Sequence, residues 1–173
     1  YQLNPDGSLG SSEPKKYSVI NYDWYFVNGM AVYPAGLTPT GGVHPAGKLY
    51  LTVDVGSRPQ QDVKTGLRVF DLDSNGYTVG DVRGYITPGF GSFGVAVNTV
   101  KRKLYVGGWA GPVYLLDIDE KGEPKGEPKS FIFGGSGKFW LVLDPSGRFI
   151  YCGLYPGVLE GVALDEEQNL IPS

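Results

Sequence analysis

A repeat of 46 residues runs through this chain and limits what it can fold into. Tyr105 and Tyr151 lie 46 residues apart, and so do Asp119 and Asp165. Each repeat holds short apolar runs separated by turns, with no apolar stripe of helical period. A four-stranded blade of a β-propeller needs roughly 40–50 residues. The period therefore predicts an all-β fold, a partial β-propeller with about three to four blades here and six or seven in the complete ring.

The composition agrees with many short strands joined by tight turns. The chain has 27 Gly and 13 Pro, and 13% of its residues are aromatic. Its formal net charge of -3 gives no basic surface, so we expect no nucleic-acid partner. No apolar run is long enough to span a membrane. Cys152 is the only cysteine, which leaves both a secreted and a cytoplasmic location open.

From the repeat we interpret the chain as a single propeller segment with four parts. These are the end of a blade (1–28), a blade with two insertions (29–92), a blade with short loops (93–138) and an incomplete blade (139–173). The insertions fall within 34–46 and 56–65 and are expected to form surface loops. We interpret Lys121–Lys129 as a polar connection.

Aliphatic side chains at repeated positions are expected to form the core between blades. They are Val32, Leu49, Leu51, Val69, Val97, Leu104, Val106, Leu116, Leu143 and Ile150. Phe93 and Trp140 are expected to fill the same core, because bulky aromatic side chains close the gaps between blades.

Three strings carry a family resemblance that spans nearly the whole chain. GMAVYPAG, HPAGKLYLT and DPSGRFIYCG resemble the strand–turn–strand units of the seven-bladed lactonase and YVTN-repeat propellers. A narrower stretch, Asn28–Val32, resembles a segment of the gluconolactonase and regucalcin family whose Asn binds a central divalent metal. The resemblance implies that Asn28 is a metal ligand, although Phe93 stands where the next metal-binding Asp is expected.

A second candidate metal site is the acidic turn of the first full blade. Asp71, Asp73 and Asn75 alternate before Gly76, as in the first half of a calcium loop. Val82 occupies the twelfth position, where such a loop has Glu. The alternative is a hydrogen-bonded hairpin turn. Calcium is the cofactor that these residues would allow, and no other cofactor is predicted.

Aromatic residues gather in the connections that open on one face of a propeller. Trp24, Tyr25, Trp109 and Tyr155 lie in such connections, and Arg58 lies in the long loop on the same face. Stacking surfaces of this kind suit sugars, aromatic metabolites or a protein. Arg58 would hold an anion or carboxylate. These five residues form the predicted ligand mouth.

Two functions of different class follow. The first is a binding scaffold that uses the mouth to bind a small molecule or partner. The second is a lactonase-like hydrolase, of the gluconolactonase or 6-phosphogluconolactonase type, acting on a sugar lactone or related metabolite. In that enzyme, Arg58 or a metal would polarise the carbonyl, and Asp23 or Asp54 would activate water. The only histidine, His44, lies in the first insertion and is interpreted as part of a turn.

The blade count also predicts a partner. About three blades are fewer than the four to eight that propellers use, and open blades would expose apolar faces. The remaining blades could come from the same precursor, from a separate chain or from a second copy. The unequal loops favour a missing or separate remainder.

Overall fold

The computed structural model describes most of the chain after residue 25. The described residues are 26–34, 36–37, 43–44, 47–54, 66–74, 76–86, 92–108, 111–132 and 138–171. Within these ranges there are thirteen strands and no helix, and thus no helix that could span a bilayer.

Eleven of the strands form three antiparallel sheets. The first sheet has the order β1 (Phe26–Tyr33), β4 (Lys48–Asp54), β5 (Gly66–Leu72) and β6 (Thr78–Ile86). The second has the order β7 (Ser92–Asn98), β8 (Lys103–Gly108), β9 (Val113–Ile118) and β10 (Pro124–Phe131). The third has the order β11 (Lys138–Leu143), β12 (Phe149–Leu154) and β13 (Val158–Ala163). The short strands β2 (Gly36–Leu37) and β3 (Val43–His44) pair within the first insertion.

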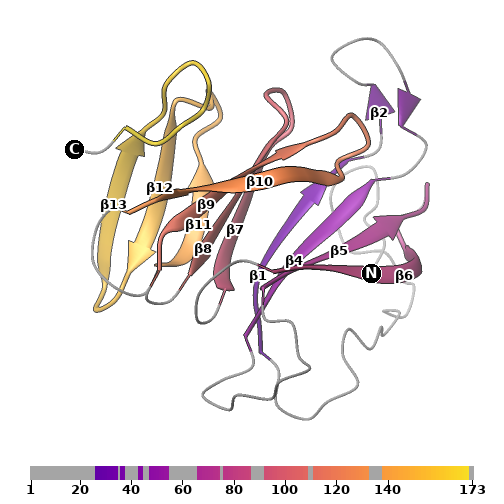
Figure 1. Ribbon diagram of the computed structural model, residues 1–173, viewed down its shortest axis with the longest axis horizontal. Helices are drawn as coiled ribbons and strands as arrows, with labels where there is room; N and C mark the ends of the chain where they lie inside the picture. Colours follow the sequence, from indigo (N-terminus) through magenta and orange to yellow (C-terminus); the bar gives the residue numbers. More distant parts are fainter. Residues whose placement is uncertain are drawn as a thin grey trace, which may run out of the picture.

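The three sheets stand side by side, with the second between the first and the third (Figure 1). Strand β7 of the second sheet contacts both β1 and β11, so the first strands of the three sheets are neighbours. The described sheets do not close into a ring. The prediction of an all-β chain built of antiparallel sheets is therefore confirmed, and a propeller is not shown.

Burial along each strand follows from the position of its sheet. In β8, Leu104–Gly108 are buried without alternation, because the second sheet is covered on both faces. In β12 the pattern alternates, with Ile150, Cys152 and Leu154 buried and Phe149 and Tyr151 exposed. One face of the third sheet is therefore packed and the other is open.

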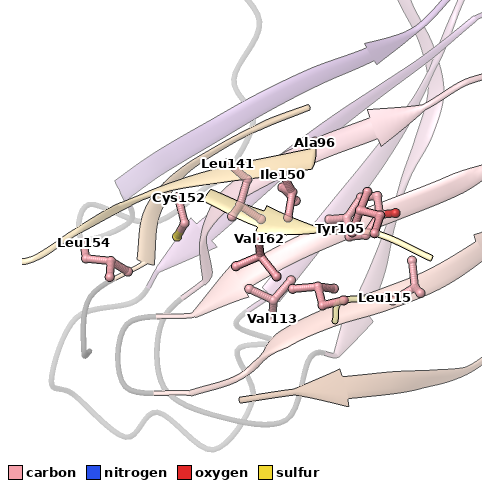
Figure 2. Packing of buried hydrophobic residues seen from close by; sticks show 11 residues of the cluster. Ala96, Tyr105, Val113, Leu115, Leu141, Ile150, Cys152, Leu154 and Val162 are labelled. Carbon is pink, nitrogen blue, oxygen red and sulfur yellow. The ribbon is translucent and has the colours of Figure 1, made fainter. Parts of the chain in front are cut away.

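The core lies in two clusters, one on each side of the second sheet. The cluster between the first and second sheets contains Tyr33, Tyr50, Leu67, Val69, Val95, Leu104, Val106, Tyr114, Leu116 and Ile118. Figure 2 shows the other cluster, in which side chains of the second and third sheets point toward one another. It contains Ala96, Tyr105, Val113, Leu115, Leu141, Ile150, Cys152, Leu154, Val162, Leu164 and Leu170.

Most of the predicted core positions are buried. The buried ones are Leu51, Val69, Leu104, Val106, Leu116 and Ile150, and Leu49, Val97 and Leu143 are half-buried. The prediction was wrong for Val32 and for Trp140, which are 49% and 65% exposed. Both lie on faces that no other described sheet covers, a circumstance that apolar patterning alone does not reveal.

The polar stretch Lys121–Lys129 was also interpreted wrongly as a connection. Most of it belongs to β10, which pairs with β9 at the edge of the second sheet. A bulge between Lys125 and Lys129, with Gly126 at φ 71°, bends the strand. Polar side chains, Pro and a bulge are typical of an edge strand that faces solvent.

Candidate binding surface

Most of the predicted mouth lies outside the described residues. Trp24, Tyr25, Arg58 and Trp109 do so, and so does Asp23. Asp54 ends β4 and His44 lies in β3, but the structure describes only their backbone. The mouth and the hydrolase therefore remain predictions.

Tyr155 and Asn28 can be placed. Tyr155 follows β12 in the turn to β13 and is 59% exposed. Asn28 lies at a bulge in β1, where the register shifts between Val27 and Gly29, and it is half-buried.

The carboxylate of the candidate calcium residue Asp71 is bound by two cations. Arg83 donates to both of its oxygens, each at 2.9 Å, and Lys48 donates to one of them. The guanidinium of Arg83, followed by the ammonium of Lys48, lowers the pKa of Asp71 below its ordinary value. Both cations also contact Glu123 of the second sheet, Arg83 at 2.7 Å and Lys48 at 3.2 Å. Asp71 thus takes part in an ion network between sheets.

Asp73 accepts a hydrogen bond from the backbone N–H of Tyr77 at 2.9 Å and stabilises its own turn. Asn75 lies outside the described residues. Among the residues that the structure describes, no group of three His, Cys, Asp or Glu could hold a metal ion. Calcium binding here stays a prediction.

The turn after the third strand of each sheet has one repeated geometry. Asp73, Asp119 and Asp165 begin these turns, and in each the carboxylate accepts from the N–H four residues later, at 2.7–2.9 Å. The residue three positions after each Asp has positive φ: Gly76 (80°), Gly122 (79°) and Gln168 (70°). We call the three segments 73–77, 119–123 and 165–169 the Asp turns.

Each of the last two Asp turns packs on a tyrosine of the preceding sheet. The hydroxyl of Tyr50 donates to the carbonyl of Gly122 at 2.5 Å. The hydroxyl of Tyr105 donates to the carbonyl of Gln168 at 2.9 Å. Burial, helped by the charge of Asp165, raises the pKa of Tyr105, so this hydroxyl stays a donor. The two sheet–sheet contacts, here called the first and second joints, use the same hydrogen bond.

The last residue of each of the last two Asp turns meets a cation of the preceding sheet's fourth strand. In the first joint, Arg83 of β6 bonds Glu123. In the second joint, Lys129 of β10 donates to Asn169 at 3.2 Å. Arg83 and Lys129 are 46 residues apart, and so are Glu123 and Asn169. The joints therefore repeat in their polar contacts as well as in their cores.

The third sheet offers the same face, and no described element of the chain covers it. Leu67, Val113 and Leu159 are 46 residues apart, yet Leu67 and Val113 are fully buried and Leu159 is 74% exposed. Tyr151 takes the place of Tyr105 and is 40% exposed. We call this surface the third-sheet outer face; it consists of Trp140, Val142, Phe149, Tyr151 and Leu159, all exposed.

Two of these rings lie flat on glycines. A Cβ on Gly153 would lie 3.0 Å from the indole of Trp140, and one on Gly161 would lie 3.0 Å from the ring of Tyr151. The rings therefore cover these two glycines, and Trp140 is 65% and Tyr151 40% exposed. A flat apolar surface of this kind can bind another apolar surface but presents no acid or base.

This surface was missed at the sequence level, although a signal was present. Tyr105 and Tyr151 keep the 46-residue spacing, and the chain has no fourth strand of the third sheet among the described residues. What the sequence lacked was evidence that the tyrosine contacts the next sheet. Comparison with protein-family models and with curated proteins gives no match to this chain.

Proposed function

We propose that this chain is a β-sheet binding scaffold and that it binds a protein partner through the third-sheet outer face. One observation carries the proposal. Leu159 is 74% exposed, whereas Leu67 and Val113, at the same position of the other two sheets, are fully buried by the next sheet. An apolar position that is buried by the next sheet in two of the three sheets is expected to be buried by another surface in the third.

The chemistry of the face favours a protein over a small molecule. It combines aromatic and aliphatic side chains on a continuous sheet, and two aromatic rings occupy the space over Gly153 and Gly161. The centres of protein interfaces are enriched in Tyr, Trp and Phe and depleted in charge. Small ligands instead favour concave sites with a few convergent polar groups.

Site-specific photo-crosslinking tests the proposal. A benzophenone amino acid in place of Leu159 is expected to crosslink to a protein when the chain is irradiated in an extract of its source cells. The same amino acid in place of Val100, which is 73% exposed in the β7–β8 turn, is the control and should give little product. Equal yields at the two positions, or no product at position 159, would refute the proposal. Mass spectrometry of the product identifies the partner.

A further inference from the structure

The molecule exposes apolar side chains at both of its ends. At one end lies the third-sheet outer face. At the other end lies the first sheet, where Met30 is 67% and Val32 49% exposed. The residues that correspond to Met30 in the other sheets, Val95 and Leu141, are 5% and 6% exposed because the preceding sheet covers them.

We infer that the partner of the third-sheet outer face is the first sheet of a second copy of this chain. The inference rests on the proposed function, since it names the partner for the same surface. In this third joint, Leu159, Val142 and Tyr151 of one copy would pack against Met30 and Val32 of the other. The Asp turn 73–77 of the second copy would lie on Tyr151, as 119–123 lies on Tyr50.

The turn of the first sheet has the geometry that this position needs. The N–H of Gly76 donates to the carbonyl of Asp73 at 3.0 Å, as the N–H of Gly122 does to Asp119 and that of Gln168 to Asp165. Gly76 has φ 80°, which turns its carbonyl as in the other two turns. A Cβ on Gly76 would meet no atom within 4 Å, so this side of the turn is open for contact.

The polarity of the two ends matches as well. In the first joint the receiving sheet presents the pair Lys48 and Asp71, and the arriving turn ends in Glu123. In the third sheet the same pair of positions holds Phe149 and Ala163. The arriving turn 73–77 ends in Tyr77. In the first joint, a charged pair on the receiving sheet contacts the carboxylate of the arriving turn. In the third joint, an apolar pair would contact the aromatic side chain of the arriving turn.

One contact in the third joint differs from its counterpart in the first. Trp140 replaces Gly29, whose Cβ would lie only 2.5 Å from the carbonyl oxygen of Phe93 in β7. The first strands of the two copies must therefore lie farther apart than β1 and β7 do, with the indole between them. This wider spacing buries an additional ring, and Trp and Tyr commonly dominate the energy of such interfaces.

The contact is head-to-tail, so two copies can form both joints at once. Two copies supply six sheets, within the four to eight of known propellers. A heterologous contact that closes in this way gives a two-copy ring with two-fold symmetry. In the sequence, the unequal loops favoured remaining blades from a longer precursor or a separate chain. The apolar complementarity of Phe149 and Tyr77 instead favours a second copy of this chain.

Light scattering coupled to size exclusion tests the inference on the full chain. The wild type is expected to have twice the mass of one chain at high concentration. Leu159→Glu and Met30→Glu should each weaken association by at least about tenfold, because each places a charge in the joint. Val100→Glu adds the same charge in a turn away from both faces and should leave the mass unchanged. Circular dichroism of each variant checks that it is folded.

Mixing the two variants gives the sharpest result. The Met30→Glu chain keeps an intact third sheet, and the Leu159→Glu chain keeps an intact first sheet, so an equimolar mixture should form a two-chain species through one joint. A Met30→Glu chain that associates as well as wild type would overturn the head-to-tail arrangement. A wild type that stays a single chain at every concentration would overturn the second copy.

A charge transplant tests the turn contact itself. Phe149→Lys or Tyr77→Glu alone should weaken association, and the two together should restore most of it, because they recreate Lys48 and Glu123 of the first joint. No restoration would show that the turn does not lie there. If position 159 crosslinks to a different protein while the wild type is a single chain, the second copy is refuted and the proposed function stands.

Discussion

Gly122 is the residue whose replacement most directly tests how the first two sheets are held together. A Cβ at this position would lie 2.9 Å from each of three atoms of the first sheet: Cγ of Lys48, Cδ1 of Tyr33 and Oη of Tyr50. The residue also has φ 79°, and its carbonyl accepts the Tyr50 hydroxyl. Gly122→Ala therefore introduces backbone strain and a collision in the joint.

The expected loss has three contributions. Alanine in the left-handed conformation costs about 1–2 kcal/mol, less about 0.4–1 kcal/mol for the stiffer unfolded chain. Displacing buried side chains costs a further 1–3 kcal/mol, to a rough estimate. If the turn moves away, the bond from Tyr50 is lost as well, at about 1 kcal/mol. The total for Gly122→Ala is about 1–6 kcal/mol.

Gly126→Ala is the matched control. Gly126 has φ 71°, but a Cβ there would meet no atom within 4 Å, so only the backbone cost of about 1 kcal/mol applies. Equilibrium unfolding in urea, with the wild-type slope retained, measures both changes. Losses in the free energy of unfolding that agree within about 0.5 kcal/mol would show that the turn does not press on the first sheet.

Three further predictions concern the joints. Tyr105→Phe should lose about 1–2 kcal/mol in urea unfolding because the carbonyl of Gln168 is left buried without its donor, whereas Tyr151→Phe, measured at concentrations where the chain is single, should lose less than about 0.5 kcal/mol; equal losses under that condition would contradict the joint. Asp71→Asn should lower stability by about 1 kcal/mol at pH 7. Because the folded pKa of Asp71 lies below the unfolded value of about 4, this difference is full above that value and disappears as pH falls through the folded pKa; a difference that persists in acid would refute it. Cys152, fully buried, should react with a thiol reagent only after unfolding, and rapid labelling of native protein would place it at the surface.

The 46-residue period was sufficient to predict an all-β chain of antiparallel sheets because it reports on the backbone. Asp73, Asp119 and Asp165 recur with that spacing, and each begins the same hydrogen-bonded turn. A turn fixed by its own backbone and one carboxylate needs no tertiary contact to form. Strand type and turn position could therefore be predicted from local sequence alone.

Burial of particular faces could not be predicted in this way. Val32 and Val97 occupy the same place in their sheets and are both valines, but Val32 is exposed and Val97 packs against the core between the first two sheets. The difference lies in whether another sheet stands on that side, which no residue of either strand encodes. The third-sheet outer face escaped prediction for the same reason.

The two joints also show why the repeat is weak in residue identity although its geometry is strict. Gly122 must be glycine because Tyr33 and Tyr50 leave no space for a side chain. In the second joint Asn98 replaces Tyr33, and the shorter side chain makes room for Gln168.

Gln168 then offsets the cost of its positive φ, about 1–2 kcal/mol for a residue other than glycine. Its side chain accepts from Asn98 at 2.7 Å and donates to the carbonyl of Gly147 at 3.1 Å, while its own carbonyl still accepts from Tyr105. Both joints require a residue of positive φ whose carbonyl accepts a hydrogen bond from a tyrosine hydroxyl. The first joint meets this requirement with Tyr33 and Gly122, and the second with Asn98 and Gln168. Because the two joints differ at both positions of the pair, neither residue considered alone reveals the repeat.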